Sequence, residues 1–422
     1  MTTADAHRSV EARPADTLLA LCLIAISGNP LLSGPAVSPI LCAVLLGHVL
    51  WARRGMLSNR FIRQFMALGA AFCIIFAAHQ WNFGLVSLPG ALFLLVKLLV
   101  GGLVVNHLGR RFVAAFFNAV AWMCVSSLVL YPVLLLIGPD SFPTLFSEAA
   151  VGANLKSILI LTVHTTPEWW RNSSMMWEPG AFQGIINLAL VLMPAALLKL
   201  PRNRVKILLM LVALLTTFST TGYLVLFVVL LVKLSGFSIP ASLKAPLLST
   251  VMTIAVVTVT QADFLGEKIM QQLSNSADQE DFSPDRFGAL LFDAYYIEKS
   301  PIFGNGLIQE TRLADHPTLH DEALGHGNGL SNFTATFGIF GLLAYLGAIC
   351  RSCAAGTPAQ RITLALIVSV LAFGEQFLTY PLFLALPFVI APDWTPVASR
   401  HLNSMRRRVE ASSPASAPQP NP

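Results

Sequence analysis

Apolar runs of about 20 residues, the length that a bilayer requires, recur along most of this 422-residue chain and constrain its fold more than any other feature. The sequence is 55% hydrophobic and only 12% charged, whereas soluble domains carry about 25% charged residues. Mean hydropathy is +0.67. These values indicate a polytopic membrane protein. Its net charge of +5 does not indicate nucleic-acid binding, because in a membrane protein the placement of charge matters more than the sum.

The apolar runs predict an all-α bundle of about twelve transmembrane helices, by the length criterion for a span. A polar break at Ser219–Gly222 separates the seventh span from the eighth, and a turn at Leu378–Pro381 separates the last two. The expected spans are approximately 17–34, 36–52, 64–82, 88–106, 112–137, 181–199, 204–219, 221–237, 245–261, 330–350, 360–377 and 379–396.

Lysine and arginine gather in the short loops on one side of this bundle, as they do in cytoplasmic loops of membrane proteins. We therefore expect both termini in the cytoplasm. Residues 1–16 are then a polar N-terminal tail, residues 17–409 are the membrane bundle, and residues 410–422 are a disordered tail rich in Pro, Ser and Ala. The cations that set this orientation are Arg53, Arg54, Arg60, Arg63, Arg110, Arg111, Lys199, Arg202, Arg204, Lys206, Arg351, Arg361, Arg406, Arg407 and Arg408.

Two long loops then face the periplasm, at about 138–180 and 262–329, and long loops in compact proteins are usually functional. The second is acid-rich and contains a helix signal: Ser283-Pro284-Asp285 is typical of a helix start, and Ser300-Pro301 of a helix end. Arg286 lies in the first turn of this helix. The apolar residues at helical spacing are Phe287, Leu290, Leu291, Ala294 and Ile297.

Two arginines in these loops could clamp a pyrophosphate, because a planar guanidinium binds two phosphate oxygens at once. Arg171 follows two tryptophans, and it could instead be an interfacial arginine beside an aromatic belt. Arg286 could instead pair with Asp285 or Glu280.

His326 stands between two glycines, just before Asn328 and an apolar run. Histidine titrates near neutrality and can move protons in catalysis, or it could cap the following helix. Glu178 is either a second active-site carboxylate or the acid at the start of the sixth span. A metal site is disfavoured because the spacing matches no strong zinc pattern; its candidate ligands would be His320, Asp321, Glu322 and His326.

Lys97 falls near the middle of the fourth span. An intramembrane cation is costly and usually has a partner or a role. Glu375, near the outer end of the eleventh span, is one candidate partner.

Four segments resemble the O-antigen polymerase/ligase superfamily, bacterial inner-membrane enzymes that assemble surface polysaccharide. The order of the segments and the two long outer loops also fit across most of the chain. The segments are Arg171–Phe182, which contains Trp177-Glu178-Pro179-Gly180; Phe218–Leu224, the small polar break between two spans; Arg286–Gly306, an arginine helix followed by a proline–glycine turn; and His326–Gly341.

The resemblance implies a metal-independent glycosyltransferase at the periplasmic face, without a cofactor. The donor would be a glycan on undecaprenyl pyrophosphate, and the acceptor another glycan or a lipid, with membrane lipids and a chain-length regulator as further partners. Arg171 and Arg286 would bind the pyrophosphate, His326 or Glu178 would act as base, and Asn328 and Lys97 would support the site.

Two departures from the family pattern bear on the choice between polymerase and ligase. Gly327 separates His326 from Asn328, where many members have histidine followed directly by asparagine, and Thr221 stands in the polar break where many carry a basic residue. We expect a polymerase of repeat units, because the Arg171–Pro179 stretch looks more like polymerases. A ligase that transfers glycan to lipid A core or protein is the alternative. A lipid-linked glycan flippase is a second, although the chain shows no internal repeat.

Overall fold

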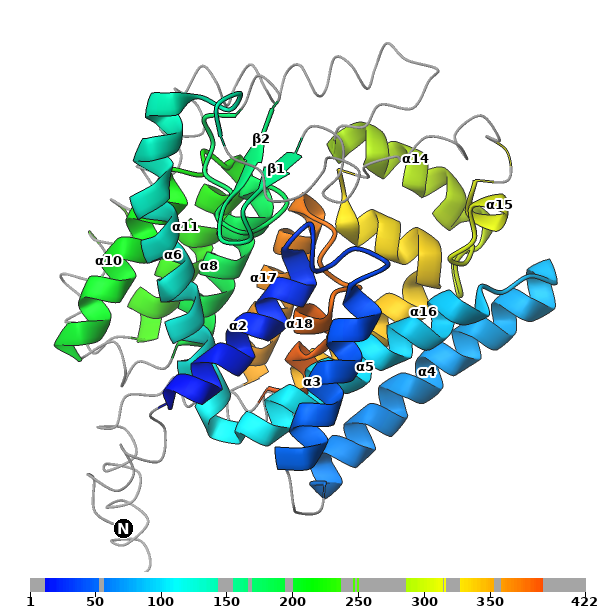
Figure 1. The fold of residues 1–422 in the computed structure, drawn as a ribbon. Coiled ribbons are helices and arrows are strands. Elements are labelled where there is room, and N and C mark those ends of the chain that lie inside the picture. Colours follow the sequence, from blue (N-terminus) through cyan, green and yellow to red (C-terminus); the bar gives the residue numbers. More distant parts are fainter. Residues whose placement is uncertain are drawn as a thin grey trace, which may run out of the picture.

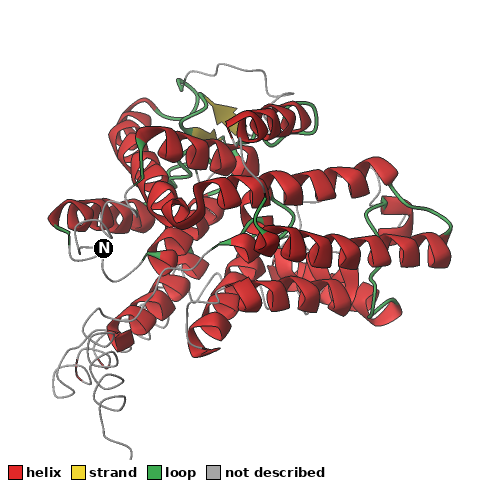
Figure 2. Ribbon diagram, turned by 90° about the horizontal axis from the view of Figure 1, so that it is seen from below, coloured by secondary structure: helices red, strands yellow, loops and turns green. Residues whose placement is uncertain are grey.

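The computed structural model describes residues 12–52, 57–142, 155–165, 169–193, 200–236, 246, 249, 286–313, 315, 327–352 and 358–389. Of these, the side chains at 234–236, 286–287, 352 and 358–359 lie outside what is described. The chain is helical almost throughout this part, and its strands there are the antiparallel pair β1 (Leu155–Ser157) and β2 (Thr162–His164), in the register Lys156 opposite Val163 (Figure 2).

The helices follow the apolar runs, with polar breaks between them. They are α2 (Pro14–Gly28), α3 (Ser38–Ala52), α4 (Asn59–Phe83), α5 (Leu88–Leu108), α6 (Phe112–Ile137), α8 (Pro179–Leu192), α10 (Pro201–Leu215), α11 (Thr220–Gly236), α14 (Arg286–Lys299), α15 (Gln309–Arg312), α16 (Gly329–Ser352), α17 (Pro358–Gly374) and α18 (Pro381–Leu384), with short 3-10 turns η1 (Gly109–Arg111) and η3 (Leu386–Phe388).

The β1–β2 pair and α14 lie at the same end of the bundle, at the top of Figure 1, whereas α3 ends and α4 begins at the opposite end. We call the end with β1, β2 and α14 the loop end. The described parts of the two long loops thus come to one face, as the sequence predicts. At the opposite end, the Arg111 guanidinium lies 2.6 Å from the Asp16 carboxylate and ties the start of α6 to α2.

Helix α16 is interrupted at Gly338, whose backbone (φ 71°, ψ 175°) is not helical. This glycine comes nine residues after Gly329, about 13 Å along the helix axis. An interruption here frees the carbonyls of Ala335 and Thr336 and the amides of Ile339 and Phe340, which would otherwise pair with each other. Unpaired backbone groups inside an apolar bundle cost several kcal/mol each, roughly.

The turn Pro301–Gly306, which follows α14, fills this interruption. The amides of Ile339 and Phe340 donate to the carbonyls of Pro301 and Ile302, at 2.8 and 3.1 Å. The amides of Asn305 and Gly306 donate to the carbonyls of Ala335 and Thr336, also at 2.8 and 3.1 Å. Each broken rung of the helix is therefore replaced by a pair of bonds to the turn. The ring Nε2 of His79 on α4 lies 2.7 Å from the Phe303 carbonyl and fixes the turn from its other side.

The described residues contain three helical segments long and apolar enough to cross a membrane: Asn59–Phe83, Leu88–Ile137 (which joins α5, η1 and α6) and Gly329–Arg351. Shorter apolar helices accompany them, at Pro14–Gly28, Ser38–Ala52, Pro179–Leu192, Thr220–Lys233 and Gln360–Gly374. The full set of twelve spans stays a prediction, and the expected ninth span lies outside the described residues except at positions 246 and 249.

Two expected spans differ from the structure because of prolines. The first ends at Gly28, not at 34, because Pro30 holds Asn29 in an extended conformation (ψ 126°). The last, 379–396, is wrong in its described part: α18 and η3 are each a single turn, and Pro387 lacks the amide that a continuous helix needs. This segment instead packs on α5, where a Cβ on Gly101 would lie 2.3 Å from the Pro381 carbonyl oxygen.

Replacing Gly338 with alanine should destabilise the protein strongly. A left-handed non-glycine residue costs about 1–3 kcal/mol, and the new Cβ would lie 2.0 Å from the Ile302 carbonyl oxygen. Gly347→Ala is the matched control, because nothing lies within 4 Å of that position on the same helix. Thermal unfolding in detergent should show a clear loss of Tm for Gly338→Ala alone. Equal Tm values for the two variants would contradict the proposed docking of the turn.

Candidate functional site

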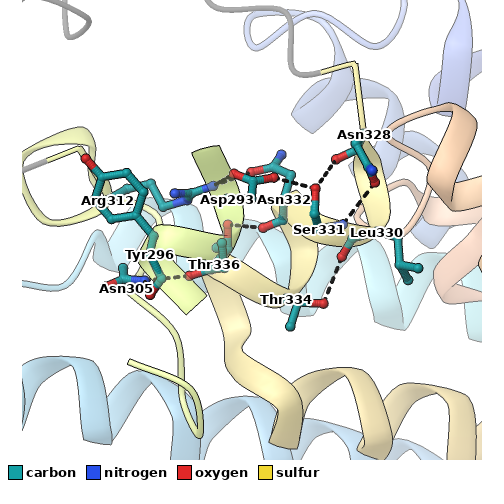
Figure 3. A network of polar contacts seen from close by, with 11 residues as sticks. Asp293, Tyr296, Asn305, Arg312, Asn328, Leu330, Ser331, Asn332, Thr334 and Thr336 are labelled. Carbon is teal, nitrogen blue, oxygen red and sulfur yellow. Dashed lines mark hydrogen bonds and ion pairs between the residues drawn. The ribbon is translucent and has the colours of Figure 1, made fainter. Parts of the chain in front are cut away.

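A buried polar network joins α14, α15 and the first turn of α16 at the loop end (Figure 3). Asp293 of α14 lies at its centre and is fully buried. One carboxylate oxygen accepts from Nη2 of Arg312, the last residue of α15, and the other accepts from the Ser331 hydroxyl at 2.6 Å. Nη2 of Arg312 also donates to Asn332 Oδ1 at 3.3 Å. The carboxylate therefore links three separate chain segments.

Arg312 retains unused hydrogen-bonding capacity within the described residues. Its side chain is 7% exposed, yet its Nε and Nη1 atoms have no partner there. The guanidinium carbon lies 5.2 Å from the centre of the Tyr296 ring, a cation–π contact that adds attraction without supplying an acceptor. Burial raises the pKa of Tyr296, and the nearby Asp315 carboxylate raises it further, so this phenol stays neutral near pH 7.

The buried face of α14 differs from its apolar residues at helical spacing, which predict an amphipathic helix on the membrane or on the bundle. Among those residues Leu291 is 58% exposed. The buried positions are instead Ala289, Asp293 and Tyr296, which repeat every three to four residues. A carboxylate can occupy the centre of this face because Arg312 and Ser331 satisfy both of its oxygens.

Asn328 is the residue before α16 and caps this helix. Its Oδ1 accepts from the Ser331 amide at 3.1 Å, an N-cap bond that satisfies one orphan amide. The side chain is completely buried, and its Nδ2 has no partner among the described residues. The candidate base His326, two residues earlier, lies outside the described residues, as do His320, Asp321 and Glu322. Arg286 is described as the first residue of α14, without its side chain.

The starts of α8 and α16 meet at Glu375, a residue that is 5% exposed and follows α17. A Cβ on Gly180, in the first turn of α8, would lie 1.8 Å from the Glu375 carboxylate. A Cβ on Gly329, the first residue of α16, would lie 2.2 Å from the Glu375 carbonyl oxygen. A carboxylate at a helix N-terminus is favourable, because that end carries partial positive charge. This junction brings the residue after Asn328 close to the segment that contains Glu178.

Glu178 is the N-cap residue of α8, exposed and without a capping bond from its side chain. Its position is therefore compatible both with an active-site carboxylate and with an acid that only begins the helix. Its neighbour Trp177 stacks on Tyr380 with ring centres 5.1 Å apart. Burial is the main reason why the pKa of Tyr380 rises to about 12, and the carboxylates of Glu375 and Glu178 contribute. Tyr380 is thus within electrostatic reach of both acids.

Arg171 lies at the break between α10 and α11. Its Nε donates to the Thr217 carbonyl at 3.1 Å, and its charge acts on the Tyr223 phenol. Trp170 packs edge-on against Phe218 at 4.7 Å, and Phe218 has a positive φ of 47°, which is uncommon for a bulky residue. Arg171 is therefore held by specific contacts at the polar break. No described contact joins it directly to Asp293 or Arg312.

Lys97 does not pair with Glu375, contrary to the candidate partnership. Among the described residues its ammonium contacts the rings of Phe93 and Tyr380, at 4.6 and 5.8 Å from their centres. Tyr380 is the neighbour that Lys97 and Glu375 share. The short chain after α17 turns Tyr380, not the Glu375 carboxylate, toward α5.

No family model matches the chain, and no curated protein matches it. The likeness to the O-antigen superfamily therefore rests on the four segments, and these segments touch one another. The first and second lie side by side: Arg171 donates to Thr217, the residue before the second segment, and Gly222 packs on Gln183, the residue after the first. The third meets the fourth at Asp293 and Ser331, and along the turn in α16. Glu375 bridges the first and the fourth.

Sequence reasoning missed Asp293, Arg312 and Ser331 as residues that bind these segments together, and it offered Glu375 only as a candidate partner of Lys97. Asp293 and Arg312 were two charges among many in an acid-rich loop. One signal was present in the sequence: Asp293 interrupts an otherwise apolar stretch of the predicted helix at a position that helical spacing assigns to the same face as Ala289 and Tyr296.

Removing one member of the Asp293–Arg312 pair should cost about 3–5 kcal/mol of unfolding free energy, because the other charge would stay buried without a partner. Asp293→Leu combined with Arg312→Met should cost less than the sum of the two single changes. Denaturant unfolding in detergent measures this coupling.

The matched control is Lys299→Met, which removes an exposed ion pair between Lys299 and Asp315 at the far end of the same helix. Exposed pairs contribute little, so its unfolding should match that of the wild type. If Asp293→Leu unfolds at the same denaturant concentration as Lys299→Met, the network does not hold α14, α15 and α16 together.

Proposed function

We propose that this chain is a membrane-embedded glycosyltransferase of the O-antigen polymerase/ligase type. Its donor is a glycan on a lipid pyrophosphate, in the family undecaprenyl pyrophosphate, and its acceptor is the hydroxyl of another glycan or lipid. The reaction takes place at the loop end, which faces the periplasm in this proposal. No metal ion or cofactor is needed for this chemistry.

The observation that carries the proposal is the contact among the four family-like segments. They are spread over Arg171 to Gly341, yet the starts of α8 and α16 share Glu375, and Asp293 ties α14 to α16. Their convergence at the loop end supports a single site built from all four.

The physical needs of the reaction match this end of the molecule. The acceptor oxygen forms a bond to the anomeric carbon, and the bond from that carbon to the pyrophosphate oxygen breaks, with its electron pair leaving on the pyrophosphate. Preplaced cations stabilise the developing negative charge. Arg171 and Arg286 are the proposed pyrophosphate ligands.

The acceptor proton must go to a base that lies within hydrogen-bond reach. His326 is the proposed base, since it precedes the buried Asn328 cap by two residues. Glu178 is the second choice of base. Glu375 is a further candidate carboxylate, although the sequence suggested it only as a partner for Lys97. In this proposal Asn328 fixes the start of α16.

A polymerase is favoured over a ligase by the likeness of Arg171–Pro179 to polymerases. A knockout strain followed by gel analysis of surface polysaccharide tests the assignment. Loss of the ladder with one repeat unit retained identifies a polymerase. Loss of all glycan from the lipid A core identifies a ligase. Donor accumulating on the cytoplasmic leaflet identifies a flippase and excludes the proposed chemistry.

Alanine at His326 or at Arg286 should leave the protein inserted but lower chain growth about a hundredfold or more, because proton transfer and charge stabilisation each contribute at least that much. Arg171→Lys should also lose activity, because an ammonium cannot bind two phosphate oxygens in the same plane. Complementation of the knockout, with membrane levels measured by immunoblot, provides the readout.

Arg204→Ala is the control, because this arginine is exposed in the first turn of α10, outside the four segments. It should restore the full ladder. Wild-type chain lengths from the His326, Arg286 or Arg171 variant would remove that residue from the mechanism.

A further inference from the structure

Lys97 is a cation in the apolar part of the bundle, and the proposed reaction assigns it no role. It lies nine residues after Leu88 on the 21-residue helix α5, about 13 Å from the helix start. Within the described residues its ammonium contacts two aromatic rings, and Cys42 is the ionisable group that acts on it. Aromatic faces attract an ammonium but accept no strong hydrogen bond from it.

Other lysines in the described bundle use their donors on the protein itself. Lys233 on α11 donates to the Val191 carbonyl at 2.9 Å and to the Met193 carbonyl, at the end of α8. Lys206 on α10 donates to Asn118 Oδ1 at 2.6 Å. An ammonium carries three donors, and Lys97 gives none of them to a described residue. A charge held this way in apolar surroundings is expensive, which makes it a candidate for binding a ligand.

The surroundings of Lys97 connect it with the loop-end site. The Tyr380 ring, 5.8 Å from the ammonium, stacks on Trp177, the residue before Glu178. Lys97 therefore lies against a ring that packs on the candidate site.

The other side of α5 is apolar. Phe93 lies one turn before Lys97 and is half-buried, whereas Leu88 and Leu92, on the far side of this helix from Lys97, are 62% and 53% exposed. Exposed leucines on a helix of this length and hydropathy are suited to contact with lipid chains. Helix α5 thus presents a face suited to lipid on one side and the Lys97 ammonium on the other.

We propose that Lys97 binds phosphate oxygens of the lipid carrier's pyrophosphate. This inference rests on the proposed function. Lysine binds phosphate as a point charge, so it needs no fixed plane, in contrast to the arginines on the loop side. A carrier of this chemistry has an apolar chain and an anionic head, for which α5 offers exposed leucines and the Lys97 ammonium.

Binding of undecaprenyl pyrophosphate without sugar to the purified full-length protein, followed by native mass spectrometry, tests the proposal without any need for turnover. Lys97→Met should weaken binding about tenfold or more, as expected for the loss of a charged contact. Lys97→Arg should keep most of the affinity. Lys233→Met is the matched control and should bind as the wild type does, because that ammonium is occupied by two carbonyls.

Thermal stability separates a binding role from a structural one. Removing an ammonium that lacks an acceptor should leave Tm unchanged or raise it, so Lys97→Met should bind less well while being at least as stable. A lowered Tm with unchanged affinity overturns the proposal in favour of a structural lysine. Displacement of the lipid by inorganic pyrophosphate at equal concentration overturns the lipid as the source of the phosphate.

The same measurement distinguishes this inference from the proposed function. Wild-type protein that binds no undecaprenyl pyrophosphate contradicts both. Wild-type protein that binds it, with Lys97→Met binding equally well, contradicts the role of Lys97 alone and leaves the proposed function standing.

Discussion

The arrangement of the loop end depends on how the chain pairs the backbone groups that are freed at Gly338. A helix inside an apolar bundle cannot leave carbonyls and amides unpaired, and here the pairs come from the turn at Pro301–Gly306. That turn is the direct continuation of α14. Pairing the broken rungs of α16 therefore also fixes where α14 ends, and with it the positions of Asp293 and of Arg286 at the other end of the helix.

The second consequence is that α14 can present a charge to the bundle. Once the turn holds α14 against α16, Asp293 faces Ser331 and Arg312, and its carboxylate is satisfied on both oxygens. The network thereby ties Arg312, at the end of α15, and Ser331, in the first turn of α16, to one helix.

Much of this fold could be predicted from the sequence, because apolar length and prolines act locally. The helices α4 to α6, the break between α10 and α11, and the end of α14 at Ser300-Pro301 all follow from such signals. The prolines also explain an error: an apolar stretch from 379 onward was expected to continue as a helix, although Pro387 prevents it. Apolar content alone does not report whether a segment crosses the bundle or turns back into it.

The candidate site was less predictable, because it depends on contacts between distant residues. Glu178, Asn328 and Lys97 were singled out one at a time, but nothing local indicates that Gly180 and Gly329 pack on the same glutamate. The buried face of α14 depends on distant contacts in the same way. Apolar spacing singles out Leu291, which is exposed, whereas Asp293 is buried because its carboxylate binds partners in α15 and α16.

The filled interruption in α16 also bears on the choice between an enzyme and a transporter. Transporters use interrupted helices whose free backbone groups coordinate substrate or ions near the membrane centre. In α16 the groups next to Gly338 are already paired with the chain's own turn: the carbonyls of Ala335 and Thr336 accept from it, and the amides of Ile339 and Phe340 donate to it. Little is left there to bind a passing substrate, and moving the turn would leave both halves of the helix unpaired. An interruption built this way suits a rigid support for chemistry at the loop end better than a moving gate.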